Sequence, residues 1–398
     1  MEPELITLQE RESTKLQSGQ ISPEDGRILF EKYGNYLDIQ LPSYMNENRW
    51  VITPRGWIGY IPFSASIHFQ INPKIPLDNL FEMLNHAYHY DVLWQKEHYQ
   101  SDTLSGFYDH LASILARKVL DRIRKGVYRS YIQQNDELPF LRERMNINSR
   151  VRSPWKVNIN CDYHEHTPDI EDNQIIAWTL NLIARSGYCS AQTLAYVRHA
   201  YHSLESYVTL LPFNSRDCIN RLYNRLNQDY EQIHSLCRFF LEQSGASHKL
   251  GERNMIPFLL EMDHLFELFV FEWLKKNLDP SLQVHSKQQI NISPDGSLKF
   301  EIDMVLKDAV TGKIISVLDT KYKHVESPST DDISQVISYA DVTQCNNAVL
   351  IYPAPLRYPR NEQPGRTRIR TMTFDLSKNL IESGQFLIAD LLSLKVYS

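Results

Sequence analysis

The sequence has few cysteines and no arrangement of them that suits a metal. They are odd in number, lack C-x-x-C spacing and lie far apart in the 398 residues. A structural zinc site or a disulfide framework needs closely patterned cysteines, so neither is expected, and reduced thiols in a cytoplasm fit best. The five cysteines are Cys161, Cys189, Cys218, Cys237 and Cys345.

Long apolar runs are also absent. The longest, Leu265 to Leu274, is broken by Glu267 and Glu272, so we expect no membrane-spanning segment. The first residues, Met1 to Glu4, are acidic and lack the apolar stretch of a secretory signal, so we expect no export. The length and ordinary composition predict a soluble protein of two or three domains.

An excess of positive charge and a nucleotide-binding loop are missing too. The formal net charge is −6, whereas proteins that grip duplex DNA by themselves usually present a strongly basic domain or face. No Walker-type glycine loop occurs, so the chain is not expected to hydrolyse nucleotide itself.

Positive charge is instead local, in two clusters. One follows the last apolar strand, where phosphate contacts and a solvated loop with an edge strand are equally good interpretations. The other lies on and after an amphipathic helix and favours a solvated or partner-facing surface. The two clusters are Arg357, Arg360, Arg366, Arg368 and Arg370, and Arg117, Lys118, Arg122, Arg124, Lys125 and Arg129.

What the sequence does contain is a predicted strand with an acid-x-lysine pattern, Ile314 to Lys323. Side chains alternate along a strand, so Asp319 and Lys321 share one face. The residues before Asp319 are largely apolar, as in a buried central strand, where an unpaired carboxylate and ammonium are costly. Buried charges of this kind usually have partners or a metal.

The preceding strand, Lys299 to Leu306, carries a second acid, Asp303, on the face opposite its apolar residues. If the two strands pair through the turn at 307–313, Asp303 lies opposite Asp319. Two acids and one ammonium suit the cutting of a phosphodiester, because a cation neutralises the phosphoryl oxygens and polarises a water. A D-x-K triplet alone is weak evidence, since charged strand faces are often simply solvated, but the buried context favours a nuclease.

Upstream, Pro257 to Asn277 is expected to form a mostly buried helix opened by proline. Glu267 interrupts its apolar surface. Completing a metal site or holding a metal-bound water would explain a carboxylate there, and an ion pair at the helix edge is an equally open alternative. His264, one turn away, is expected to be a partner of Glu267 rather than a ligand.

Downstream, a helix is expected over Asp331 to Asp341, with Thr330 as its N-cap. It carries Gln335 and Tyr339 four residues apart, and hence on one face. A strand of the buried type, Asn347 to Pro353, follows. The order helix, strand, strand, helix, strand predicts a mixed α/β domain.

Elsewhere, short strands are expected over Trp50 to Tyr60 and Ser66 to Ile75, and an extended segment over Met145 to Tyr163. His164-Glu165-His166 is favoured as a surface loop over a metal site, and His86 and His89 as packing or helix-surface residues. Helical periodicity covers Asn79 to Gln95, Leu104 to Gly126, Glu171 to Gly187, Ala191 to Tyr207 and Ser215 to Ser244.

The expected fold is therefore an α+β multidomain chain. A β-rich N-terminal region is predicted for residues 1–78, a mainly helical middle region for 79–250, and a C-terminal mixed α/β nuclease domain for 251–398.

Together these residues resemble two known groups of proteins. The acids, the lysine and the Gln335-x-x-x-Tyr339 helix look like the PD-(D/E)xK nuclease superfamily, with Ile302 in place of the usual proline. Over nearly its full length the chain also resembles the McrC family, the endonuclease subunits of McrBC restriction systems. Glu143 is a departure, since the family usually has glycine in that segment. The similar segments are Thr53 to Ile61, Ile71 to Ile75, Gly126 to Tyr131, Glu171 to Ile175, Met262 to Glu267 and Asp319 to Tyr322.

The resemblance implies a Mg²⁺-dependent DNA endonuclease. Asp303 and Asp319, with the Thr320 carbonyl, are then expected to bind Mg²⁺, and Glu267 to complete or orient the metal–water shell. Lys321 is expected to position the attacking water or to stabilise the phosphate. Gln335 and Tyr339 are expected to support the site or to touch the DNA backbone.

The resemblance also implies partners. An N-terminal docking region would bind a hexamer of an McrB-like AAA+ GTPase and stimulate it, and that GTPase would recognise double-stranded DNA containing 5-methylcytosine or another modified cytosine. Two alternatives remain open: another PD-(D/E)xK nuclease acting in repair or on unmodified DNA, and a non-catalytic assembly factor for an AAA+ motor.

Overall fold

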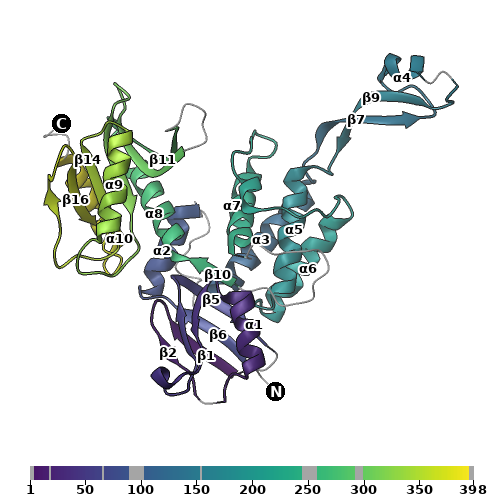
Figure 1. Cartoon of the computed structure of the whole chain (residues 1–398). Helices are drawn as coiled ribbons and strands as arrows, with labels where there is room; N and C mark the ends of the chain where they lie inside the picture. Colours follow the sequence, from purple (N-terminus) through teal and green to yellow (C-terminus); the bar gives the residue numbers. More distant parts are fainter. Residues whose placement is uncertain are drawn as a thin grey trace. The chain divides into compact units, whose positions relative to one another are not determined.

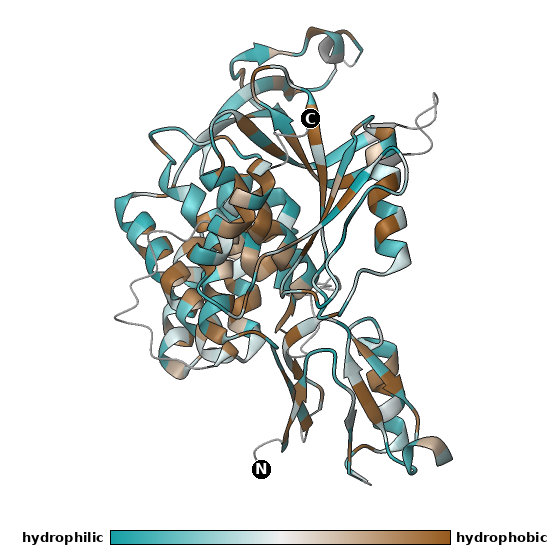
Figure 2. Cartoon of the chain, turned by 90° about the vertical axis from the view of Figure 1, so that its left-hand side faces the viewer, coloured by the Kyte–Doolittle hydropathy of each residue, from teal (hydrophilic) through white to brown (hydrophobic). Residues whose placement is uncertain are grey.

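The computed structural model describes residues 4–17, 19–64, 67–88, 103–152, 155–243, 258–291 and 299–393. It has mixed α/β architecture, as the sequence predicts at this coarse level (Figure 1). The chain forms two compact units, Met1–Trp94 with Leu259–Ser398, and Gln95–Phe258. Apolar residues recur along the strands and helices of both (Figure 2). Within the described ranges, no helix is long and apolar enough to cross a membrane.

Two small sheets form the N-terminal part of the first unit. The larger has the order β1-β6-β5-β10, from β1 (Glu4–Gln9), β6 (Ile67–Asn72), β5 (Trp57–Pro62) and β10 (Phe258–Glu261). The smaller has the order β2-β4-β3, from β2 (Thr14–Lys15), β4 (Val51–Pro54) and β3 (Leu37–Gln40). Helices α1 (Pro23–Tyr33) and α2 (Leu77–Tyr88) and the short turn η1 (Tyr44–Asn46) complete this part.

The predicted strands in this region are confirmed, but the expected alternation on β6 holds only in part, because His68 is buried as well. Ile67, Phe69 and Ile71 are buried there. The turn between β4 and β5 passes the chain from the small sheet to the larger one, and Gly56 in it has φ +77°, a conformation that favours glycine.

A six-stranded sheet forms the C-terminal part of the first unit, with the order β11-β12-β13-β14-β16-β15. The strands β11, β12 and β13 are antiparallel neighbours, whereas β13, β14 and β16 run parallel. The strands are β11 (Leu282–Asn291), β12 (Lys299–Asp308), β13 (Ile314–Thr320), β14 (Asn347–Tyr352), β15 (Asn361–Glu362) and β16 (Arg368–Thr373).

Three helices pack on this sheet. One face is covered by α9 (Thr330–Val342), whose Val336 and Ala340 join a core cluster with Val305, Val317 and other strand residues. The remaining helices, α8 (Met262–Asn277) and α10 (Leu380–Leu392), pack together, with Gly384 directly against the indole of Trp273. A side chain at Gly384 would collide with that ring.

Several predicted boundaries in this part need correction. The helix expected from Pro257 begins at Met262, because residues Phe258–Glu261 extend the N-terminal sheet as β10; Pro257 itself lies outside the described residues. Ser329, not Thr330, caps α9, since its side chain accepts a hydrogen bond from Asp332 N at 3.1 Å. The sequence analysis did not predict the strand β11.

The second unit is a bundle of α3 (Leu104–Lys125), α5 (Glu171–Ser186), α6 (Ala191–Glu205) and α7 (Asp229–Gln243). The first three were predicted within two residues. The helix expected over Ser215 to Ser244 is wrong before Asp229, where only the turn η3 (Ser215–Cys218) is helical. Asn224 and Asn227 bind backbone amides there, which competes with helix formation. His89 and Ser244, named in the predictions, lie outside the described residues.

A three-stranded sheet, β7-β9-β8, forms an arm of the second unit (Figure 1). It contains β7 (Ser130–Leu138), β8 (Arg144–Met145), β9 (Ile159–Thr167) and the short helix α4 (Ile147–Arg152). The prediction of an extended Met145 to Tyr163 is therefore right only at its ends. His164-Glu165-His166 lies on β9 and not in a loop, although both histidines are exposed as expected.

Candidate active site

Two carboxyl groups meet on the six-stranded sheet. Met304 pairs with Leu318 in the antiparallel register of β12 and β13, which places Asp303 and Asp319 next to each other. Their carboxyl groups lie close enough for the negative charge of Asp319 to act on Asp303. Asp319 is 0% exposed and Asp303 is partly buried. The predicted pairing of these two acids across the strands is therefore found in the fold.

Burial and mutual repulsion make this pair hold a proton. Loss of solvent, then the negative charges of Asp319 and Glu267, raise the pKa of Asp303 to about 8. Burial also raises the pKa of Asp319, although the ammonium of Lys321 opposes that rise. Two carboxylates this close cannot easily both ionise without a cation, so the pair is a strong acceptor for one.

Lys321 links the acids to α9. Its Nζ lies 2.8 Å from Asp319 Oδ2 and donates to Gln335 Oε1 at 3.0 Å. Gln335 Nε2 in turn donates to the Tyr339 hydroxyl at 2.8 Å. Burial alone would lower the pKa of Lys321, but the two aspartates outweigh it and raise that pKa, so the side chain stays charged. The structure thus brings together the predicted lysine, glutamine and tyrosine.

Glu267 lies at the edge of this site. Its side chain, on α8, is 24% exposed, so it is less buried than expected. It is near enough to raise the pKa of Asp303, and His264 Nδ1 lies 4.0 Å from its Oε2, which agrees with the partner role predicted for His264. Across the described ranges, no three His, Cys, Asp or Glu side chains converge as a ready-made metal site.

The residues present nevertheless fit a hard divalent cation. Apart from the Lys321 ion pair, neither carboxylate oxygen of the fully buried Asp319 has a hydrogen bond of good geometry to any described residue. Oxygen ligands are what Mg²⁺ prefers, and it usually keeps several waters, so two protein carboxylates can suffice. Thr320, whose carbonyl was the third expected ligand, ends β13 directly beside Asp319.

Sequence reasoning missed a second ion pair at this site. Lys323 Nζ lies 2.9 Å from Asp332 Oδ1, and the negative charge of Asp332 contributes to the raised pKa of Asp319. Asp332 was not among the predicted site residues. The continued alternation Asp319, Lys321, Lys323 was the signal that pointed to it.

The C-terminal arginines have partners within the chain. Arg357 pairs with Glu326 at 3.3 Å and Arg360 with Glu362 at 2.9 Å. The side chains of Arg366, Arg368 and Arg370 donate to Asn346, Asn361 and Ser393. Because β14 separates β16 from β13, this cluster does not border the acidic pair along the sheet. Arg368 and Arg370 lie on β16, which is an inner strand and not the expected edge strand, and Arg370 is buried.

Comparison with known proteins identifies the family. A family model described as a McrBC 5-methylcytosine restriction system component matches residues 52–353. The chain belongs to the McrBC family. The match spans every candidate residue of the site, from Glu267 to Tyr339.

Two more distant similarities agree with this McrBC assignment. The Type IV methyl-directed restriction enzyme EcoKMcrBC of Escherichia coli strain K12 is 22% identical over 340 residues, which covers 79% of this chain and 94% of that protein. A chain in the structure of Thermococcus gammatolerans McrB AAA+ hexamers with bound McrC has a TM-score of 0.55 at 17% identity. That comparison covers 98% of this chain and 100% of the other, and it shows a shared fold.

Proposed function

We propose that this chain is the nuclease subunit of a modification-dependent restriction system, cutting DNA phosphodiester bonds with Mg²⁺. The observation that carries the proposal is the Asp303–Asp319 pair beside Lys321, since two buried, repelling carboxylates are costly unless they serve a cation. The fold supports it, because α8, β12, β13 and α9 carry the proposed site residues or end directly beside them within one unit.

Each residue of the site has a chemical task in this reaction. Asp303 and Asp319 would hold Mg²⁺, which supplies neutralisation of the phosphoryl oxygens and polarisation of a water. Lys321 would donate hydrogen bonds to the attacked phosphate or to the water, at a place fixed by Gln335. Tyr339 keeps the Gln335 amide oriented, and Glu267 would accept a hydrogen bond from water beside Asp303.

We further propose that the chain acts with a hexameric AAA+ GTPase of the McrB type, which recognises double-stranded DNA with modified cytosine. The family assignment and the McrB hexamers with bound McrC in the similar structure support this partner. A net charge of −6 fits a subunit that its partner delivers to DNA, because weak phosphate contacts then suffice.

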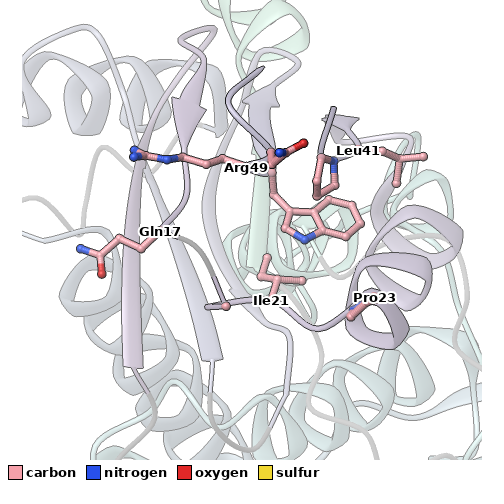
Figure 3. A pocket seen from close by; sticks show the side chains of 9 residues that line it. Gln17, Ile21, Pro23, Leu41 and Arg49 are labelled. Atoms are coloured by element: carbon pink, nitrogen blue, oxygen red, sulfur yellow. The ribbon is translucent and has the colours of Figure 1, made fainter. Parts of the chain in front are cut away.

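Exposed apolar surfaces suit such a partner. In the predicted N-terminal docking region, a pocket of about 440 Å³ is lined by Ile21, Pro23, Leu41 and Trp50 among others (Figure 3). Close by in sequence, Tyr44 and Met45 are each 96% exposed. The arm of the second unit offers another such surface, with exposed Tyr131, Phe140, Leu141, Ile147, Val151, Trp155 and Val157.

Reconstitution tests the proposal directly. Chain and partner GTPase are mixed with methylated or unmethylated plasmid, GTP and Mg²⁺. We expect cleavage of methylated plasmid only, and Asp319→Ala should abolish it while stimulation of the GTPase persists. Cutting by Asp319→Ala would refute the site, and stimulation without any cutting by the native chain would favour a non-catalytic assembly factor. The matched control is Glu301→Gln, because Glu301 is an exposed acid on the same strand as Asp303.

A further inference from the structure

A pair of charged residues follows β1 at the point where the N-terminal sheet of the first unit ends. Glu10 is 0% exposed, and Arg11 lies beside it with Nε 3.7 Å from Glu10 Oε1. Their backbone is fixed, because Glu10 N donates to Asn72 O and Arg11 N to Pro54 O. A wholly buried carboxylate is costly unless it has partners, so the contacts of Glu10 indicate which parts of the fold it holds together.

The first contact of this pair reaches the segment directly after β13, which carries Lys321. The Tyr322 hydroxyl donates to Glu10 Oε2 at 3.3 Å, and Lys74 N donates to the same oxygen at 3.4 Å. Tyr322 is 1% exposed and directly follows Lys321. Its ring packs against Phe266 of α8, with the ring centroids 5.8 Å apart. Glu10 therefore holds the residue next to the site lysine.

The second contact reaches the helix that carries Glu267. Arg11 Nη2 lies 2.6 Å from Asp263 Oδ2, and Asp263 stands in the first turn of α8, four residues before Glu267. Met262 N also donates to Gly56 O at 3.0 Å. A Cβ on Gly56 would lie 2.7 Å from Arg11 Nη2 and 2.8 Å from Asp263 Oδ2, so a side chain at this position would push the ion pair apart.

We propose that Glu10 and Arg11 are positioning residues for DNA cleavage, which hold Lys321 through Tyr322 and Glu267 through Asp263. The inference rests on the proposed nuclease function. It explains why Gly56, Lys74, Asp263 and Tyr322, which lie in four separate segments of the family resemblance, meet at one place. None of these four is among the proposed metal ligands.

Kinetics of the reconstituted complex test the proposal. Tyr322→Phe removes one hydroxyl and should lower kcat for cleavage by roughly ten- to a hundredfold, because small misplacements of a site cost that much. KM for DNA and stimulation of the GTPase should not change. Arg11→Lys keeps a charge for Asp263 and should retain more activity than Arg11→Met. Tyr33→Phe, at another buried tyrosine of the first unit, should cut like the native chain.

Hydrogen–deuterium exchange supplies a readout that does not depend on cutting. Tyr322→Phe and Arg11→Met should speed amide exchange at residues 321–323 and in the first turn of α8, respectively, with little change in unfolding temperature. Native kcat and native exchange in both variants would overturn the proposal, as would a joint loss of cutting, GTPase stimulation and stability. If the native complex does not cut at all, the proposed function fails, while the exchange data still decide whether Glu10 and Arg11 hold the two segments.

Discussion

Replacing Asp303 with asparagine should stabilise the metal-free protein. The pKa of Asp303 is raised to about 8 from an ordinary value of 3.8, because burial and the neighbouring acids disfavour its charge. An acid of this kind stabilises the fold fully below its unfolded pKa, and that stability is lost as pH rises through the folded pKa. Between about pH 4 and pH 8, native metal-free protein should therefore become progressively less stable.

The size of the effect follows from the same shift. The ordinary pKa of 3.8 lies roughly 3 pH units below pH 7. At about 1.4 kcal/mol per unit, the native protein therefore loses at most about 4 kcal/mol of stability by pH 7. Because Asp303 is only partly buried and shares its proton with Asp319, we expect about 2 kcal/mol. An asparagine amide can donate to Asp319 at every pH, so Asp303→Asn should unfold roughly 4–8 °C higher than the native chain in EDTA at pH 7.

Mg²⁺ should make the native protein more stable than Asp303→Asn. With Asp303 as a Mg²⁺ ligand, as proposed, native protein should gain about 2.7 kcal/mol when Mg²⁺ is present at a hundred times its dissociation constant, whereas the variant should gain little. Thermal unfolding measured from pH 4 to pH 8, in EDTA and in excess Mg²⁺, checks both the stability without metal and the stabilisation by Mg²⁺. A variant less stable than native protein in EDTA at pH 7, or a difference that does not vary with pH, would refute the reasoning. Glu301→Gln again serves as the control.

Two backbone predictions follow from single positions. Gly384→Ala should lower the free energy of unfolding by roughly 1–3 kcal/mol, since its Cβ would lie 2.2 Å from the Trp273 indole, whereas Gly365→Ala has open space and should be near neutral in denaturant titrations. Glu143 has φ +51°, where glycine is favoured, so Glu143→Gly should slow proteolysis of the arm. Faster proteolysis would show that the contact of Glu143 with His164 outweighs the backbone strain.

The parts of the site that the sequence predicted are those set by local geometry. Asp319 and Lys321 share a face because strands alternate, and Gln335 meets Tyr339 because four residues make about one helical turn. Asp303 faces Asp319 because a short turn joins their strands. In each case the partners lie on one element or on two consecutive strands, so the periods of those elements and the short turn between them are sufficient information.

The parts that escaped prediction depend on distant segments. The apolar pattern of Phe258–Glu261 predicts a helix, yet these residues form a strand that pairs with β5, about two hundred residues earlier in the chain. Tyr322 and Glu10 are 312 positions apart, so no pattern within one element connects them. Tertiary pairing outweighs local propensity at such places. Glu143 is the reverse case, where its departure from the family's glycine coincides with a positive φ.

The exposed arginines and the buried Asp319 differ in what their charges cost, because a buried charge is more costly than an exposed one. Arg357 and Arg360 pair with carboxylates of their own chain, but these ion pairs are exposed and stabilise the fold little. Asp319 is fully buried and paired with Lys321, but neither of its oxygens has a further hydrogen bond to a described residue, so a bound cation would offset the remaining cost of its charge. In the proposed function, this chain supplies the chemistry on DNA, and with a net charge of −6 a partner would supply most of the phosphate contacts.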